Sequence, residues 1–398
     1  MIDDVLVLSP SAMVAGGDAL AHDAAGRVVF VAGALPGERV EAVVVERRRD
    51  YFRAVAADVL DPSPDRVPPP CAALAAGCGG CTWQHVAPAA QVRLKQAVVA
   101  DALRRIARLP DGPPAEVVGL PGPALRTTAR LAVGDDGRAG HRASDGGGAV
   151  PTDRCLVAHP LLEELVVAGR YPGAGEVVLR AGVASGERLA LVDAHRREVE
   201  VPAGVAVVGP GGSAVVHEEV AGRRFRISAR SFFQPGPVAA EGLVAAVSAA
   251  VGDALGAGDH LVDAYAGTGL FGSVLGAAAG ARVTAVESDR WAAADARANL
   301  AGLDARVVAV EVGRFEAGRC GPAAVVVADP ARPGLGRPGV AALAAAGAPR
   351  LVLVSCDPAS LARDAVLLAG AGYRLATLAL VDAFPHTFHV ETVARFDR

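Results

Sequence analysis

The sequence predicts an α/β protein of three parts, in which a C-terminal α/β domain follows a small N-terminal β-barrel and a β-rich central domain. Residues 231–398 alternate strand-length apolar runs, such as HLVDAY and AAVVVAD, with alanine-rich helical stretches. This βαβ repeat is typical of a mostly parallel sheet with helices on both faces. Residues 1–61 contain short valine-rich runs separated by turn signals, a pattern typical of a small antiparallel barrel.

Turn and breaker residues divide the chain between these parts. The proline-dense stretch DPSPDRVPPP at 61–70 cannot continue a strand or a helix, so we expect it to link the barrel to the central domain. Residues 62–230 are assigned to the central domain, which contains one amphipathic helix over 91–109 and is otherwise β-rich and irregular. The βαβ domain then occupies residues 231–398.

The charge and the N-terminal residues limit the class of protein. The formal net charge is −4, which excludes a wholly basic nucleic-acid binder and leaves room for a local basic patch. The N-terminus MIDDVLVLSP carries two acids where a signal peptide needs basic residues. We find no uninterrupted apolar run of about 18 residues and therefore expect no membrane span. A cytoplasmic protein with reduced thiols is expected.

Three of the six cysteines lie in the short segment CAALAAGCGGCTWQH. Clustered cysteines in a reducing compartment bind metal more often than they form disulfides, so the candidate ligands are Cys71, Cys78 and Cys81. A fourth ligand is needed, and Cys155 is a stronger candidate than His85. The spacing alone leaves zinc and an iron–sulfur cluster both open, because soft thiolates suit either. No role is predicted for Cys320.

A glycine-rich turn follows the first strand of the C-terminal domain, in LVDAYAGTGLFG at 261–272. Asp263 lies near the end of that strand, and Gly267 and Gly269 allow the backbone to approach a ligand closely. Glu287 follows at the end of the second strand, where an acid can accept hydrogen bonds from ribose hydroxyls. The acid before the glycines favours S-adenosylmethionine (SAM) over NAD, and a turn used only for packing is a third interpretation.

Three reactive side chains follow later strands of the same predicted sheet. Asp329 and Cys356 are placed at the carboxyl ends of two strands, where open α/β sheets bind ligands, and Glu391 lies in a C-terminal strand. Alone, such a cysteine is usually a small buried hydrophobe. Beside a cofactor pocket, the thiol and the carboxyl together meet the needs of one reaction. Methylation at carbon 5 of uracil requires a thiolate that adds to carbon 6 and a base that removes the carbon-5 proton.

Five segments, in order along the chain, resemble the motifs of the RNA 5-methyluridine (uracil-C5) methyltransferases, a SAM-dependent family. They are SFFQP, DAYAGTG, VADPARPG, VSCDPASLARD and FPHTFHVE. The resemblance implies a Rossmann-like methyltransferase fold for the C-terminal domain. It further implies that the SAM site is lined by Gln234, Tyr265, Glu287 and Asp329, that Cys356 is the nucleophile and that Glu391 is the general base.

The resemblance extends to the N-terminal parts of the chain. The barrel is similar to a TRAM domain, an RNA-binding module often attached to these enzymes. The cysteine pattern resembles one that carries a 4Fe–4S cluster, with Cys71, Cys78, Cys81 and Cys155 as ligands. We expect a structural role for the cluster, because the methyl transfer needs no electron transfer. A barrel combined with a cysteine cluster favours ribosomal RNA over transfer RNA as the substrate.

Three positions depart from the family pattern. Ala331 stands where a second proline usually follows the motif aspartate, Asp357 replaces an asparagine after the nucleophile, and Leu270 replaces an asparagine after the glycine turn. A negative charge at Asp357 is expected to raise the pKa of the neighbouring thiol. None of the three removes a group that the reaction requires.

Other functions and contacts stay open at this point. An RNA-binding protein that kept the fold without activity is one, and a NAD-dependent enzyme is another. A cytosine-C5 methyltransferase uses the same thiol addition, but its cysteine usually follows a proline, and here Ser355 precedes the thiol. For RNA contact, ERRRDYFR at 46–53 offers arginines beside Tyr51 and Phe52, or else a charged barrel edge with two core aromatics.

Overall fold

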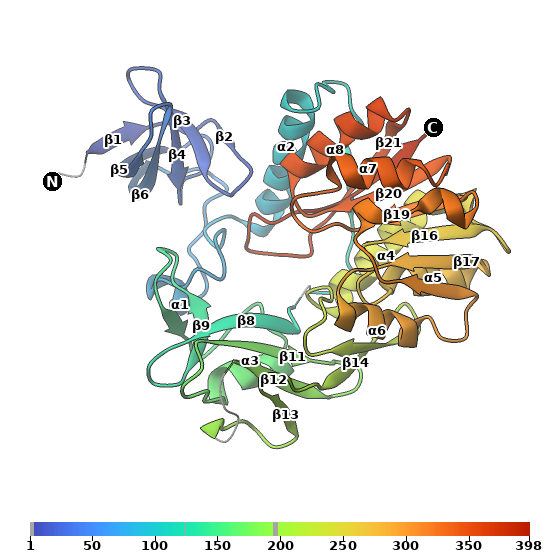
Figure 1. The fold of residues 1–398 in the computed structure, drawn as a ribbon. Helices are drawn as coiled ribbons and strands as arrows, with labels where there is room; N and C mark the ends of the chain where they lie inside the picture. Colours follow the sequence, from blue (N-terminus) through green and yellow to red (C-terminus); the bar gives the residue numbers. More distant parts are fainter. Residues whose placement is uncertain (1–3, 124, 194–197) are drawn as a thin grey trace.

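A computed structural model describes residues 4–123, 125–193 and 198–398. The chain folds into an N-terminal sheet, a central β-rich module and a large α/β domain (Figure 1). The N-terminal sheet has the order β1-β5-β6-β4-β3-β2. Its strands are β1 (Val5–Leu8), β2 (Ala12–Met13), β3 (Ala19–His22), β4 (Val28–Ala32), β5 (Arg39–Arg47) and β6 (Tyr51–Asp61). Buried positions alternate with more accessible ones along β4 and β5, as the sequence pattern predicts. The closure of this sheet into a barrel stays a prediction.

The central module is a second six-stranded sheet followed by a hairpin. The sheet order is β10-β9-β8-β11-β12-β13, and β14 pairs with β15. Its elements are α1 (Ala72–Ala75), β8 (Thr128–Val133), β9 (Ala139–Arg142), β10 (Ala149–Pro151), α3 (Pro160–Ala168), β11 (Glu176–Ala181), β12 (Arg188–Val192), β13 (Val205–Val208), β14 (Val215–Val220) and β15 (Arg223–Ser228). Helix α3 buries Leu162 and Leu165 against Leu179 of β11, which gives the six-stranded sheet a core of its own, whereas the hairpin buries Phe225 and Ile227 in the core of the C-terminal domain.

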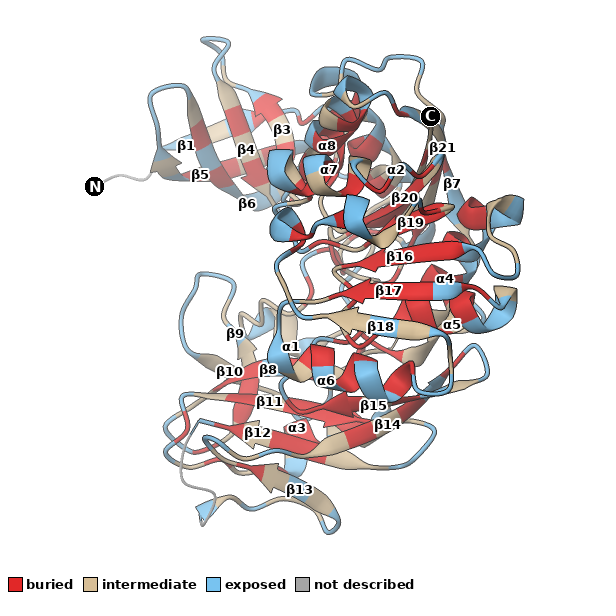
Figure 2. Cartoon of the chain, turned by 45° about the vertical axis from the view of Figure 1, so that its right-hand side comes forward, coloured by how far each residue is buried: buried red, intermediate tan, exposed pale blue. Residues whose placement is uncertain are grey.

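The C-terminal domain is an eight-stranded sheet of order β18-β17-β16-β19-β20-β22-β21-β7. Its strands are β7 (Ala115–Val118), β16 (His260–Ala264), β17 (Arg282–Val286), β18 (Ala305–Val308), β19 (Val325–Ala328), β20 (Arg350–Ser355), β21 (Arg374–Val381) and β22 (Glu391–Asp397). The five strands β18, β17, β16, β19 and β20 are parallel, and β22 runs antiparallel between β20 and β21. The central strands are continuously buried (Figure 2), which explains why they read as unbroken apolar runs.

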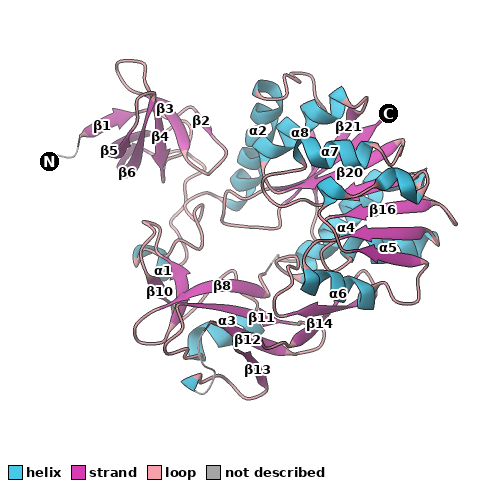
Figure 3. Cartoon of the chain, viewed as in Figure 1, coloured by secondary structure: helices cyan, strands magenta, loops and turns pink. Residues whose placement is uncertain are grey.

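Helices cover both faces of this sheet (Figure 3), as the βαβ repeat predicts. Helices α4 (Pro237–Val251), α5 (Leu270–Ala279) and α6 (Arg290–Asn299) contribute to the core on one face. Helices α2 (Pro88–Arg105), α7 (Gly336–Ala344) and α8 (Pro358–Gly370) contribute to the core on the other face. Three short 3₁₀ helices complete the domain, η2 (Gly252–Ala254), η3 (Val312–Arg314) and η4 (Ala317–Cys320).

Helix α2 and strand β7 belong to this C-terminal domain, although the sequence pattern placed them in a central domain of residues 62–230. Strand β7 pairs in parallel with β21, with Ala115 opposite Leu378. Helix α2 buries Val99 and Leu103 in the same core as helix α8. The boundary was wrong because composition shows where a strand lies but not which distant strand it joins. The central module is therefore inserted between β7 and α4.

The stretch Pro237–Ala254, which contains α4, is long and apolar enough to cross a membrane by length and composition alone. No such run was expected from the sequence. Half of the stretch is buried inside the fold. Helix α4 packs against β20, β21 and β22, with Leu243 and Val247 in the core. Its apolar composition is that of a core helix.

Candidate active site

The carboxyl ends of four adjacent strands bring the predicted residues to one edge of the sheet. Asp263 lies in β16, Glu287 directly follows β17, Asp329 directly follows β19, and Cys356 directly follows β20. These strands are neighbours in the order β17-β16-β19-β20. In an open α/β sheet this edge is where ligands bind, so the arrangement agrees with the expected site.

The turn after β16 is held by the two predicted acids. The backbone N–H of Gly267 donates to Glu287 Oε2 at 2.8 Å, and the N–H of Gly272 donates to Asp263 Oδ2 at 2.8 Å. A Cβ atom added to Gly272 would lie 2.8 Å from the same Asp263 oxygen, so this close approach requires glycine. Tyr265 adopts a φ of 57°, an unfavourable conformation for a tyrosine, and such strain is concentrated at functional sites.

A cavity of about 250 Å³ opens beside this turn. Tyr265 and Glu287 line it, as predicted from the sequence. Its other walls are mostly apolar and were not predicted: Val286, Ser288, Val310, Glu311, Val312, Gly313, Leu335, Pro338 and Gly339. They come from the end of β17 and the residue after Glu287, from the segment of β18 to η3, and from the start of α7. A cleft that combines apolar walls with two carboxylates, Glu287 and Glu311, suits a ligand that has a flat ring and hydroxyl groups.

Gln234 and Asp329 meet although they lie far apart in the sequence. Gln234 Nε2 donates to Asp329 Oδ2 at 3.2 Å. Gln234 is buried and Asp329 is partly buried. Burial raises the pKa of the Asp329 carboxyl to about 7. Burial also raises the pKa of Asp263 to about 7, and the negative charges of Asp329 and Glu287 add to this effect. The carboxyl groups of Asp263 and Asp329 can therefore gain or lose a proton near neutral pH.

Cys356 and Glu391 lie at facing ends of adjacent strands. Ser355 of β20 pairs with Thr392 of β22, and Thr392 Oγ1 donates to the Ser355 carbonyl at 3.0 Å. Because the strands are antiparallel, the next residues beyond this pair are Cys356 and Glu391. The register thus places the predicted nucleophile beside the predicted base.

The surroundings of this pair favour its neutral forms. Burial, together with the charges of Glu391 and Asp329, raises the pKa of the Cys356 thiol to about 11, and Arg332 acts in the opposite direction. Burial also raises the pKa of Glu391 well above its usual range. Arg332 is the cation of this site. It was not predicted from the sequence, although it stands in the VADPARPG segment.

The three departures from the family pattern have local explanations. Asp357 is the N-cap of α8, and its carboxylate accepts from Ser360 N at 2.7 Å. The charges that mainly raise the thiol pKa are Glu391 and Asp329, and the expected effect of Asp357 stays a prediction. Its carboxylate stabilises the helix N-terminus. Leu270 is buried as the first residue of α5, and Ala331 is exposed.

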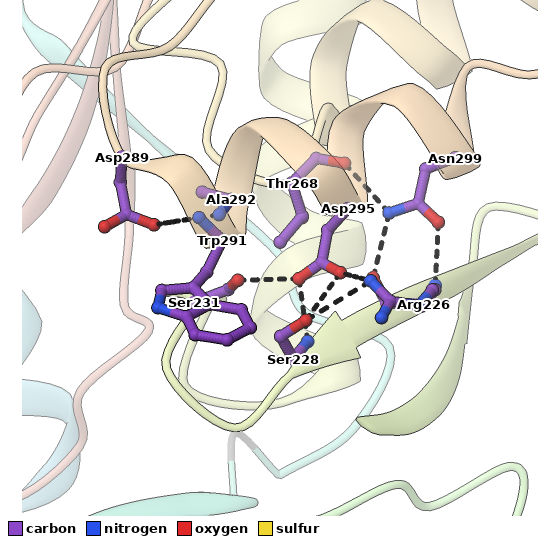
Figure 4. Close-up of polar contacts among 9 residues, drawn as sticks. All are labelled: Arg226, Ser228, Ser231, Thr268, Asp289, Trp291, Ala292, Asp295 and Asn299. Atoms are coloured by element: carbon purple, nitrogen blue, oxygen red, sulfur yellow. Dashed lines mark hydrogen bonds and ion pairs between the residues drawn. The ribbon is translucent and has the colours of Figure 1, made fainter. Parts of the chain in front are cut away.

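The segment that carries Gln234 is anchored by a buried carboxylate that the sequence did not predict (Figure 4). Asp295 of α6 accepts from Ser228 N at 2.7 Å, from Ser228 Oγ at 2.8 Å and from Ser231 Oγ at 2.6 Å, and it pairs with Arg226. Phe232 follows Ser231 directly and exposes 69% of its surface. An aromatic ring so exposed, two residues before Gln234, is an expected docking point for a flat ligand.

The four predicted metal ligands line one small cavity. They are Cys71, Cys78, Cys81 and Cys155, and all four thiols are free. His141 and Gln84 line the same cavity, whereas His85 is not among its lining residues. Within residues 4–123, 125–193 and 198–398, no group of three or more His, Cys, Asp or Glu side chains is arranged to hold a metal ion. The fold therefore gathers the sulfur donors without presenting a finished metal geometry. Cys320 lies elsewhere, in η4.

The arginine-rich segment at 46–53 forms the junction of β5 and β6. Phe52 is buried, with the guanidinium groups of Arg27 and Arg47 at 4.3 and 4.7 Å from its ring centroid. Tyr51 is half-buried, and Arg53 lies near its ring. Phe52 thus belongs to the core of this sheet, and the arginines supply the polar surface over it.

Comparisons with known proteins were made at the level of family models, sequences and structures. No family model matches the chain. An uncharacterized RNA methyltransferase of Streptomyces coelicolor is 40% identical over 95% of this chain and 90% of its own length. The 23S rRNA (uracil(1939)-C(5))-methyltransferase RlmD of Alkalilimnicola ehrlichii is 33% identical over 95% of this chain and 95% of its own length.

Among solved structures, the chain is similar to the Pyrococcus abyssi tRNA (uracil-54, C5)-methyltransferase in complex with S-adenosyl-L-homocysteine. The two share 24% identity, the match covers 98% of this chain and 99% of the other, and the TM-score is 0.73. This likeness confirms an α/β methyltransferase fold that extends over nearly the whole chain.

Proposed function

Because this chain belongs to the family of RNA methyltransferases, we propose that it transfers a methyl group from SAM to carbon 5 of a uridine in RNA. The observation that carries the proposal is the meeting of Cys356 and Glu391 at facing strand ends, beside the nucleotide-type cavity. A thiol and a carboxyl in one pocket suit nucleophilic addition followed by proton removal. Asp263 before the glycine turn favours SAM over NAD as the cofactor.

Cys356 and Glu391 act at successive steps of the proposed reaction. The Cys356 thiolate forms a bond to carbon 6 of uracil, and the ring electrons move to carbon 5. When bound, SAM would supply an electrophilic methyl group, which carbon 5 takes as the bond between that methyl and the sulfonium sulfur breaks and S-adenosyl-L-homocysteine is left. Glu391 removes the carbon-5 proton, the double bond re-forms, and the bond between sulfur and carbon 6 breaks. The nucleophile is thereby regenerated, and the methylated uridine can leave.

Activation of the thiol depends on the substrate-bound state. A thiol with a pKa near 11 is almost wholly protonated at neutral pH, so the resting enzyme is protected against oxidation and stray reactions. Arg332 is the group that favours the thiolate. We infer that substrate binding strengthens this influence and also displaces water from the pocket.

The SAM site is proposed to extend from the cavity to the Gln234–Asp329 pair. The apolar residues Val310, Val312 and Leu335 suit the adenine ring, and the Glu287 carboxylate suits ribose hydroxyls. Gln234 and Asp329 offer polar groups closer to the thiol. Asp263 and the glycines Gly267 and Gly269 would shape the turn that the cofactor lies against.

RNA is proposed to bind across the N-terminal sheet and the central module, with the target uridine turned out of any stacked structure. The exposed ring of Phe232 is a stacking platform for a base next to the target. The N-terminal sheet is proposed to act as a TRAM-like RNA-binding domain. Ribosomal RNA is favoured because RlmD is a full-length relative, and a transfer RNA is the alternative. A cytoplasmic location is part of the proposal.

The cysteine cavity is proposed to hold a 4Fe–4S cluster through Cys71, Cys78, Cys81 and Cys155. Four free thiols around one cavity are the donor set that such a cluster requires, so the residues fit the group. The free sulfur atoms must move on binding, since they do not form a metal-holding group in the described residues. When bound, the cluster would cross-link the cysteine segment to the β9–β10 region. It takes no part in the methyl transfer.

Two variants test the proposed function with tritiated SAM and unmodified ribosomal and transfer RNA. Cys356→Ala should abolish methyl transfer and leave SAM binding intact, because the thiol lies outside the nucleotide cavity. Glu391→Gln should trap a covalent protein–RNA adduct on a denaturing gel, because addition can proceed without proton removal. Full activity of Cys356→Ala would refute the proposed role of Cys356 as the nucleophile. Mass spectrometry of RNA from a deletion strain would identify the uridine.

A further inference from the structure

The loop of residues 382–390 joins β21 to β22 and ends directly before Glu391. Side chains and backbone from outside the loop hold its polar groups. The Phe384 carbonyl accepts from Lys95 Nζ at 2.9 Å. The His386 N–H donates to Gln91 Oε1 at 2.7 Å, and its carbonyl accepts from Trp83 N at 2.8 Å. The position of the loop therefore depends on α2 and on the segment just before it.

Lys95 is the only lysine in the chain, and its side chain is fully buried. Its Nζ lies 2.6 Å from Asp382 Oδ1, at the first residue of the loop. Burying a cation is costly unless it is paired and hydrogen-bonded, and an apolar side chain would pack as well at this point of α2. The ammonium group adds an ion pair with Asp382 and a hydrogen bond to the Phe384 carbonyl, both in the loop. The burial of this charge is thus explained by what it holds.

Gln91 lies one helical turn before Lys95 and uses both ends of its amide. Its Oε1 accepts from His386, and its Nε2 donates to the carbonyl groups of Trp83 and Val86 at 3.1 and 2.8 Å. His386 has a φ of 62°, which costs energy in a residue other than glycine. Such a conformation persists only where its surroundings fix it. Two successive turns of α2 therefore fix the middle and the start of the loop.

The loop leads directly into Glu391, the first residue of β22. The backbone of Glu391 is fixed by its pairing with Val381, across the base of the loop. The aromatic rings of Phe384 and Phe388 pack on His389, with centroid distances of 5.6 and 4.3 Å. Glu391 is 7% exposed. A loosened loop would admit water and would let this side chain change rotamer, although its backbone stayed in place.

We propose that Lys95 is a positioning residue for the general base, acting through Asp382 and the Phe384 carbonyl to fix the loop that leads into Glu391. This inference rests on the proposed function. Gln91 has the same role through His386. Neither residue touches the nucleotide cavity or Cys356, so only the step that uses Glu391 should depend on them.

The test compares the steps of the reaction in matched variants. Lys95→Met combined with Asp382→Asn removes both charges and keeps the approximate shapes of the side chains. SAM affinity, measured by calorimetry, should stay within about twofold of wild type, since the SAM site is untouched. Methyl transfer should fall by about 10- to 100-fold, the effect expected of a slightly misplaced catalytic group. The protein–RNA adduct should accumulate, because proton removal is the slowed step.

Two further variants keep the test decisive. Gln91→Leu should give the same adduct and slow turnover, and it decides the matter if the double variant does not fold. Asp101→Asn, on an exposed position of the same helix, should behave as wild type. Wild-type turnover in a folded Lys95 or Gln91 variant would overturn the positioning role, as would slow turnover without any adduct.

Glu391→Gln, run in parallel, separates this inference from the proposed function. An active wild type and a trapped Glu391→Gln adduct, with fast Lys95 variants, would remove the positioning role alone. A wild-type protein that transfers no methyl group to any RNA would remove both.

Discussion

Replacement of Asp295 by alanine should destabilise the protein and weaken SAM binding. The carboxylate is fully buried and accepts three hydrogen bonds from Ser228 and Ser231, besides its ion pair with Arg226 (Figure 4). Alanine would leave these donors without an acceptor. Ser231 lies three residues before Gln234, so the same change would release the segment that reaches Asp329.

The magnitude follows from the burial of each partner. Removing one member of a buried charge pair typically costs about 3–5 kcal/mol. Arg226 keeps 37% of its side-chain surface exposed and can be solvated, so we expect the lower end, about 3 kcal/mol. A loss of this size lowers the melting temperature by about 6–12 °C in a domain of 150–250 residues. Asp289 of the same helix is the matched control, because it caps the N-terminus from the surface and its loss costs only about 1 kcal/mol.

Thermal unfolding and SAM calorimetry would be measured on Asp295→Ala and Asp289→Ala. We expect a clearly larger loss of melting temperature at Asp295, together with a weaker affinity for SAM. Equal losses in the two variants would refute this expectation, since the buried network would then contribute no more than a surface cap. An unchanged SAM affinity in Asp295→Ala would show that the hydrogen bonds of Asp295 are not needed to hold Gln234 in the SAM site.

Three other outcomes are expected. The value of kcat/KM should rise about tenfold per pH unit between pH 7 and 9, because the Cys356 thiol has a pKa near 11 and the thiolate is the reactive form; a flat profile would show another route of activation. Asp329→Asn should weaken SAM binding yet make urea unfolding less dependent on pH. The raised pKa of this buried acid means that the folded wild type holds a proton between about pH 4 and 7, so its stability falls as pH rises through that window; an unchanged slope would contradict this assignment. Anaerobically purified protein should be brown and contain iron and sulfide, and Cys155→Ser should lose the colour, whereas a colourless protein with one zinc would replace the cluster proposal.

The site could be predicted wherever a motif and a strand end coincide. Asp263, Glu287, Asp329 and Cys356 each mark the end of an unbroken apolar run, and parallel strands bring their ends to one edge. The contact between Gln234 and Asp329 was implied only by the family resemblance, because a lone amide in a loop has no pattern of its own.

The supporting residues could not be predicted, because their partners are remote in sequence. Lys95 looks like one polar position on an amphipathic helix until β21 and its loop are placed beside it. Asp295 lies in an alanine-rich helix with ordinary charges around it. The same limitation misplaced β7, whose partner strand comes near the end of the chain. Local sequence specifies an element, whereas these residues acquire their roles from its neighbours.

The insertion of the central module also governs how the protein can be divided and how it must be made. A fragment that begins at residue 231 would lack β7 and α2, so β21 would become an open sheet edge beside exposed core residues, which favours aggregation. During synthesis, β7 emerges long before β21, its partner strand. The C-terminal domain therefore begins to be synthesised before the central module but can complete its sheet only after the whole chain is made. The chain leaves this domain near Leu120 and re-enters at α4, where Leu120 packs on Gly242. A linker between these two points would nevertheless remove Gln234 and the hairpin β14–β15, whose Phe225 and Ile227 lie in the same core as α4, so the methyltransferase domain cannot be freed by this deletion.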